Sequence, residues 1–96
     1  MRRISFGGCR LTDQNWAADI CYDILAEPVE TGSVLFCEDY GVRIELIPAS
    51  GTIEVAELRG ITPSWRVIEQ FADKLYRNRV TPAAARDVLE DYLAAL

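Results

Sequence analysis

Residues 62–77 read TPSWRVIEQFADKLYR, and this stretch carries both the start and the periodicity of a helix. Thr62 followed by Pro63 is a typical helix start, a hydroxyl N-cap with proline at the first helical position. Apolar residues then recur at spacings of three and four, which indicates an amphipathic helix that ends near Arg77. They are Trp65, Ile68, Phe71, Ala72 and Leu75.

The stretch that follows repeats the same start. Thr81 and Pro82 precede a second apolar pattern that runs to the last residue. It consists of Ala85, Val88, Leu89, Tyr92, Leu93 and Leu96. Residues 78–80 leave only a short connection, so we expect the two helices to form a helical hairpin.

Upstream of the helices, the periodicity changes to that of β-strands. Residues 42–46 alternate between apolar and charged side chains, and so do residues 53–55. Residues 48–52 (PASGT) between them are typical of a turn, which predicts a β-hairpin. Residues 33–40 contain a further candidate strand, VLFC, which meets a bend or bulge at Gly41.

Residues 13–27 fit both a helix and a strand. Their apolar residues recur every four positions, as in a helix, and also alternate, as in a strand. The motifs CYDIL, YGVRI and RVTP, the last leading into DVLEDYL, resemble a family of short proteins from clostridia-type Gram-positive bacteria whose domain is of unknown function. They begin at residues 21, 40, 79 and 87, and the resemblance covers roughly residues 20 to 95. It implies an early strand at residues 19–26, a second strand at the Tyr-Gly motif and two helices, and it implies no catalytic residues.

These patterns predict an α+β fold, a small antiparallel sheet of three or four strands followed by a C-terminal helical hairpin packed on one face. The 96 residues leave room for a single domain. Its expected parts are an N-terminal segment (1–12), a β half (19–58) and two helices (62–96). The expected core is Ile20, Val42, Ile44, Leu46, Ile53, Val55, Ile68, Phe71, Leu75, Val88, Leu89 and Tyr92.

The residue inventory argues against catalysis, cofactor binding and metal binding. The chain has no histidine, which removes His-based general bases, catalytic triads and the commonest zinc ligands. Cys9, Cys21 and Cys37 form no C-x-x-C pair, so we expect buried thiols that act as small hydrophobes. The acids of residues 87–91 read as the solvent face of a helix. We therefore expect no enzyme, no cofactor and no metal.

The longest apolar run, residues 92–96, is far shorter than the roughly 20 residues of a membrane span. Arg2 and Arg3 are not followed by the apolar stretch of a signal peptide. The expected location is therefore the cytoplasm.

The formal net charge of −5 is distributed unevenly, as +3 over residues 1–10, −9 over residues 11–57 and +1 over residues 58–96. The acidic β half is either a solvated surface or one that docks on a basic partner. The candidate partner-binding residues are Asp23, Glu38, Asp39, Glu45, Glu54 and Glu57. The same charge opposes direct binding to nucleic acid.

Three hypotheses about function follow. We favour a non-catalytic protein-binding module, most concretely a small acidic inhibitor or regulator that docks on a basic, nucleic-acid-binding surface of a partner, as phage-encoded inhibitors of defence nucleases do. The alternative is a regulatory or structural protein that forms a homodimer through Tyr92, Leu93 and Leu96. A nucleic-acid binder of the helix-turn-helix type is the least favoured.

Overall fold

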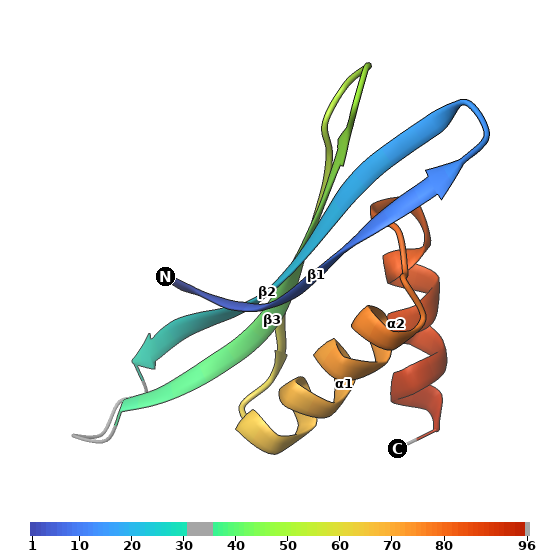
Figure 1. Cartoon of the computed structure of the whole chain (residues 1–96). Coiled ribbons are helices and arrows are strands. Elements are labelled where there is room, and N and C mark those ends of the chain that lie inside the picture. Colours follow the sequence, from blue (N-terminus) through green and yellow to red (C-terminus); the bar gives the residue numbers. More distant parts are fainter. Residues whose placement is uncertain (31–35, 96) are drawn as a thin grey trace.

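The computed structural model describes residues 1–30 and 36–95 and confirms the α+β fold. Antiparallel strands form one sheet in the order β1-β2-β3-β4; they are β1 (Arg2–Asp13), β2 (Trp16–Glu30), β3 (Phe36–Pro48) and β4 (Glu54–Thr62). The helices are α1 (Trp65–Arg77) and α2 (Ala85–Ala94), with the short 3₁₀ turn η1 (Pro82–Ala84) between them. Both helices lie on the same side of the sheet (Figure 1).

The core lies between α1 and one face of the sheet, which we call the inner face. Alternate residues of β2 point to this face and are buried, among them Ile20, Tyr22 and Ile24. The Tyr22 hydroxyl donates a 2.9 Å hydrogen bond to the backbone carbonyl of Val80, which ties the central strand to the connection between the helices. Burial is the main reason that the pKa of Tyr22 is raised above its ordinary value.

Most of the predicted core is confirmed. Seven of the expected residues are buried: Ile20, Val42, Ile44, Leu46, Ile68, Phe71 and Leu75. Those from the last helix, Val88, Leu89 and Tyr92, are half-buried and pack against this core. The prediction is wrong for Ile53 and Val55, which are 53% and 45% exposed. Val55 lies opposite Glu45 and points away from the helices, and the hairpin tip that carries Ile53 projects beyond them (Figure 1).

Residues 1–12, for which the sequence predicts no element, belong to the edge strand β1. It pairs with β2 from Arg2 opposite Ala26 to Asp13 opposite Trp16. The register shifts between Ser5 and Gly7, which is the mark of a β-bulge. Because of the bulge, inward-facing positions change from even to odd numbers along β1, and a simple alternation does not reveal the strand.

The remaining strands agree with the sequence analysis. Residues 13–27, whose pattern fits both a helix and a strand, lie mostly in strand β2, as the family resemblance implied. Val34 and Leu35 of the candidate strand lie outside the described residues, and β3 begins at Phe36. The hairpin predicted around residues 48–52 connects β3 to β4.

The irregularity predicted at Gly41 lies in the partner strand: Gly41 alone faces residues 59–61 of β4, where the β3–β4 register shifts, while the β2–β3 register runs through Gly41 without a shift. Gly41 is required there by close packing. A Cβ atom at this position would lie 2.2 Å from the carbonyl oxygen of Leu58 and 2.9 Å from the Cα atom of Arg59. Only glycine lets β4 approach β3 this closely.

Both predicted helix caps need correction. Thr62 ends β4 and pairs with Tyr40, so its backbone is part of the sheet and α1 begins later. The actual N-cap is Ser64, whose hydroxyl accepts a 3.2 Å hydrogen bond from the backbone N–H of Val67. Thr81 occupies an N-cap position, but its side chain makes no cap hydrogen bond, and η1 precedes α2. Within residues 1–30 and 36–95, no helix is long and apolar enough to cross a membrane.

The expectation of three buried thiols is wrong. Cys21 and Cys37 are exposed, and Cys9 is half-buried. Cys21 occupies an odd-numbered position of β2, and these positions point away from the helices. Its neighbours there are carboxylates rather than a second apolar layer.

Candidate protein-binding surface

The face of the sheet that points away from the helices, which we call the outer face, carries most acids of the β half. Strand register defines it, because paired residues share a face: Asp23 lies opposite Arg43, and Arg43 lies opposite Glu57. Its described carboxylates are Asp19, Asp23, Glu27, Asp39, Glu45 and Glu57, and its arginines are Arg3, Arg10, Arg43 and Arg59. Six carboxylates and four guanidinium groups give this face a formal net charge of −2.

The structure brings together four of the six predicted partner-binding residues on the outer face: Asp23, Asp39, Glu45 and Glu57. Glu38 and Glu54 fall on the inner side of their strands, because their register partners are Pro28 and Leu46. Both lie near the ends of the sheet.

Arg43 lies at the centre of the outer face, and its side chain is only 18% exposed. Its Nη1 donates a 2.7 Å hydrogen bond to Glu57, and its Nη2 donates a 3.0 Å bond to Glu45. These two bonds raise the pKa of the Arg43 guanidinium. Arg43 therefore holds carboxylates of β3 and β4 in fixed positions.

The side chain of Arg59 extends across a neighbouring strand on this face. β3 lies between β2 and β4, yet Arg59 of β4 donates hydrogen bonds of 2.7 and 2.6 Å to Glu27 of β2. The close approach of β4 at Gly41 brings Arg59 near enough. The hydrogen bond from Arg59 is the main reason that the pKa of Glu27 is lowered.

The remaining ion pairs come from β1. Arg10 lies 3.2 Å from Asp19, and Arg3 lies 3.7 Å from Asp23. Off this face, Arg2 binds Glu38 with two hydrogen bonds. Among the described residues, Asp39 and Glu54 are predicted partner-binding acids that form no ion pair.

The pairing of these arginines is not visible in the sequence. Only Arg43 had a local signal, because it alternates with Glu45 along one strand. Arg3, Arg10 and Arg59 lie on the edge strands, and their pairing depends on strand order. These three arginines, together with the placement of Glu38 and Glu54 on the inner side, leave the surface far less negative than the −9 of residues 11–57 suggests.

One end of the outer face is less polar. Cys21 lies opposite Glu45, which lies opposite the exposed Val55, and Ile47 is half-buried in the next row. Partial burial, followed by the charges of Glu45 and two aspartates, raises the pKa of the Cys21 thiol. A raised pKa keeps the thiol protonated and unreactive.

The apolar end of the last helix offers less surface than predicted. Tyr92 packs on Phe71 of α1, with ring centroids 5.1 Å apart. Leu93 is 45% exposed, and Leu96 lies outside the described residues. Homodimerisation through this end stays a prediction that rests mainly on Leu93.

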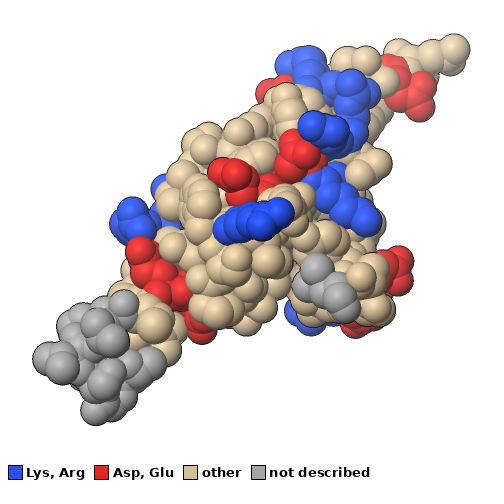
Figure 2. Space-filling model, turned by 90° about the horizontal axis from the view of Figure 1, so that it is seen from below, with Lys and Arg blue, Asp and Glu red and all other residues tan. Residues whose placement is uncertain are grey.

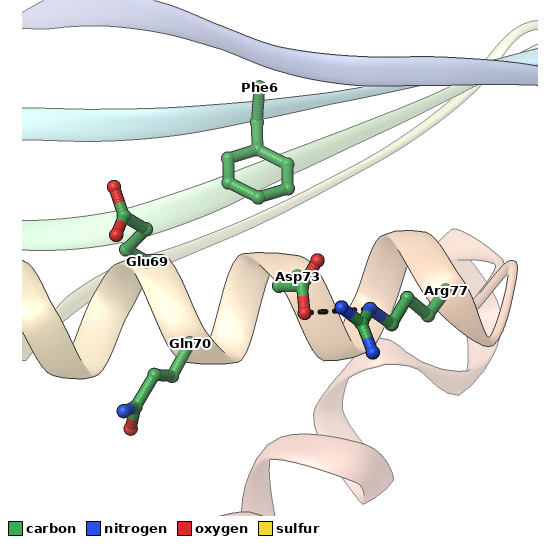
Figure 3. Close-up of a pocket in the computed structure, with 5 residues that line it drawn as sticks. All are labelled: Phe6, Glu69, Gln70, Asp73 and Arg77. Carbon is green, nitrogen blue, oxygen red and sulfur yellow. Dashed lines mark ion pairs between the residues drawn. The ribbon is translucent and has the colours of Figure 1, made fainter.

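A groove lies between α1 and β1 and is lined by Phe6, Glu69, Gln70, Asp73 and Arg77. Figure 3 shows Phe6 pointing from β1 toward the helix, along which the polar residues are arranged. Asp73 and Arg77 form a 2.9 Å ion pair. The described residues that line the groove include no cysteine or serine. The part of the chain that the structure describes holds no cluster of three potential metal ligands.

Figure 2 shows the molecule from below, and on this face basic and acidic side chains are intermixed. A nucleic-acid-binding surface normally shows a continuous basic patch or stripe. This side of the molecule therefore offers little support for the helix-turn-helix hypothesis.

A model for a protein family described as "Family of unknown function (DUF6514)" matches residues 5–95. The match includes most of β1, all of the other three strands and both helices. No curated protein and no solved structure matches the chain.

Proposed function

The chain belongs to DUF6514, a family of unknown function, and we propose that it is a non-catalytic protein-binding module. The family supplies no activity, so the surface has to carry the argument. The supporting observation is the outer face, which no helix covers and which combines six carboxylates with the exposed Val55. Its occupant in this proposal is a basic surface of a partner protein.

The mixture of groups on the outer face favours a protein partner over a nucleic acid. Protein interfaces combine an apolar part with a polar rim, and Ile47 and Val55 supply an apolar end beside the carboxylates. Phosphate backbones are repelled by carboxylates and attracted by unpaired cations. The arginines of this face are instead engaged with its own acids.

The arginines also affect how a partner would bind. Arg43 binds both Glu45 and Glu57 through Oε2, so the other oxygen of each carboxylate is left for a donor from the partner. Because these carboxylates are already fixed, docking loses little side-chain entropy. The low net charge means that charge sets orientation and association rate more than total affinity.

The most concrete version of this proposal is an inhibitor or regulator that occupies a basic, nucleic-acid-binding groove. Asp39 supports it, because this acid has no internal ion pair in the described chain and is available to a partner's lysine or arginine. A partner of this kind would be released as salt rises, since exposed charges are screened over about 8 Å at physiological ionic strength.

Capture from bacterial lysate with two matched variants tests the proposal. The first variant, Asp39→Lys with Glu57→Lys, changes the outer face. The second, Asp87→Lys with Glu90→Lys, changes the exposed surface of α2 by the same charge. Circular dichroism first establishes that both variants are folded.

We expect the wild type and the α2 variant to retain the same protein in low salt, and the outer-face variant to lose it. Equal retention by both variants, or selective loss with the α2 variant, would show that the acidic face is only a solubilising surface.

A further inference from the structure

The edge strand β1 presents a row of backbone groups that no strand covers. β1 contains 12 residues and pairs only with β2 in the described sheet. The opposite edge strand is interrupted, because Gly60 of β4 has a φ of +63° and the β3–β4 register shifts beside it. β1 contains no proline and no residue with positive φ. A long edge strand whose only irregularity is one bulge is a template for another strand.

We propose that two copies of this chain pair through β1, antiparallel, and form one continuous eight-stranded sheet. The two-fold axis passes through Gly8, and the bulge between Ser5 and Gly7 shifts the register by one residue on each side of it. In this register, Arg2 lies opposite the partner's Asp13, and Ile4 lies opposite the partner's Leu11. The pairing surface is the backbone edge of β1, which borders the outer face and lies apart from the end of α2.

The bulge in β1 supports this register. Residues that face each other in an antiparallel pair must point to the same side of the sheet. Ile4 and Leu11 both point to the inner side, because the shift between Ser5 and Gly7 changes the parity of the strand. In a regular strand, residues 4 and 11 would point to opposite sides. With Gly8 opposite the partner's Gly8 and one extra residue, Phe6, in each bulge, all directly opposed residues point to the same side.

The charges along β1 favour the same register. Opposing Arg2 to Asp13 creates an ion pair at each end of the new strand pair, and Arg10 then lies opposite Ser5. A shift by two residues would instead place Arg3 opposite the partner's Arg10, which is unfavourable. Arg2 already donates to Glu38 through Nη2, and its guanidinium has further N–H groups for Asp13.

The other arginines of β1 do not protect the edge. Charged side chains on an edge strand commonly prevent pairing with a second chain. Arg3 and Arg10 are instead directed to Asp23 and Asp19 of the neighbouring strand, at 3.7 and 3.2 Å. The edge is thus left without the usual charged protection.

Pairing through β1 would also cover apolar surface. Ile4, Phe6, Cys9 and Leu11 are only half-buried, although all pack against the core. Phe6 lines the groove beside α1 (Figure 3), and in the proposed register the partner's Cys9 lies opposite Gly7, next to Phe6. The dimer would bury this apolar row against the same row of the partner's β1.

The first test is the mass in solution by light scattering at micromolar concentrations. We expect twice the monomer mass of 10.8 kDa. A monomer over the whole concentration range would overturn the proposal.

Disulfide cross-linking tests the register in a background where the three native cysteines are replaced by serine. Arg3→Cys with Thr12→Cys places two exposed thiols directly opposite each other across the two-fold axis, within the Cα separation of about 4.4–6.8 Å that a disulfide needs. The matched control, Arg3→Cys with Arg10→Cys, places them on a diagonal at about 7–8 Å. We expect covalent dimers from the first pair and not from the control. Cross-linking only in the control, or in neither variant of a dimeric protein, would overturn the register.

A charge swap provides a test without new thiols. Arg2→Glu alone and Asp13→Arg alone should each weaken the dimer about tenfold, the size expected for two exposed ion pairs. The double variant should recover wild-type affinity, because both pairs are restored with reversed sign. Glu38→Gln is the control for the loss of the internal Arg2 contact and should leave the dimer unchanged. Failure of the double variant to recover would contradict the pairing of Arg2 with Asp13.

Discussion

Replacing Gly41 by alanine should destabilise the protein more than any other single added methyl group at a glycine. The new Cβ atom would lie 2.2 Å from the Leu58 carbonyl oxygen, where contacts under 3.0 Å essentially never occur. The two strands would have to separate by at least 0.8 Å, because the atoms nearest to the new Cβ are backbone atoms of Leu58 and Arg59, which cannot rotate away. Overpacking of this kind costs about 1–3 kcal/mol, and each ladder hydrogen bond weakened adds about 1 kcal/mol. The expected loss is therefore about 3–4 kcal/mol.

Gly60→Ala is a matched control, because Gly60 has a φ of +63° but no atom within 4 Å of a built Cβ. This variant carries only the strain of a left-handed backbone, about 1 kcal/mol. For a domain of this size, 1 kcal/mol lowers the melting temperature by about 4–8 °C. Thermal and urea unfolding followed by circular dichroism should thus show a loss for Gly41→Ala about three times that of the control. Equal losses would refute the close-approach argument.

Three further predictions follow from single contacts. Ser64→Ala should lower the free energy of unfolding in urea by about 1 kcal/mol, whereas Thr81→Ala should have almost no effect, because only Ser64 makes a cap hydrogen bond. The ion pair with Arg59 lowers the pKa of Glu27, so its contribution to stability is present above about pH 4.5 and is lost as the pH falls below that value; Glu27→Gln should flatten this part of the stability–pH curve. Tyr22→Phe should cost about 1–2 kcal/mol in the same urea assay, because a buried carbonyl loses its donor.

Local patterns were sufficient for the helices and the central strands. The spacing of Ile68, Phe71 and Leu75 predicts the buried face of α1, since three- and four-residue periodicity is a property of one helix alone. Alternation from Val42 to Leu46 likewise predicts which side of β3 is buried. In these segments each residue's environment is set by its immediate neighbours in the chain.

The candidate surface depends on register, which no local pattern contains. The acids of the β half are visible in the sequence, but the strand order brings Arg59 across β3 to Glu27, and Arg3 and Arg10 to the aspartates of β2. These contacts join residues far apart in the chain. They convert a strongly acidic segment into a face with a small net charge.

Tertiary structure also decided which residue caps α1, where two local signals competed. Thr62 and Ser64 are both acceptable helix caps, and the pairing of Thr62 with Tyr40 in the sheet leaves the cap to Ser64. The sequence gives no signal for β1, because its bulge reverses the inward-facing parity and its glycines are poor strand formers on their own. The alternation of apolar and polar residues predicts a strand only while it is unbroken. A strand with a bulge is instead stabilised by its neighbour, here β2, which pairs with it before and after the bulge.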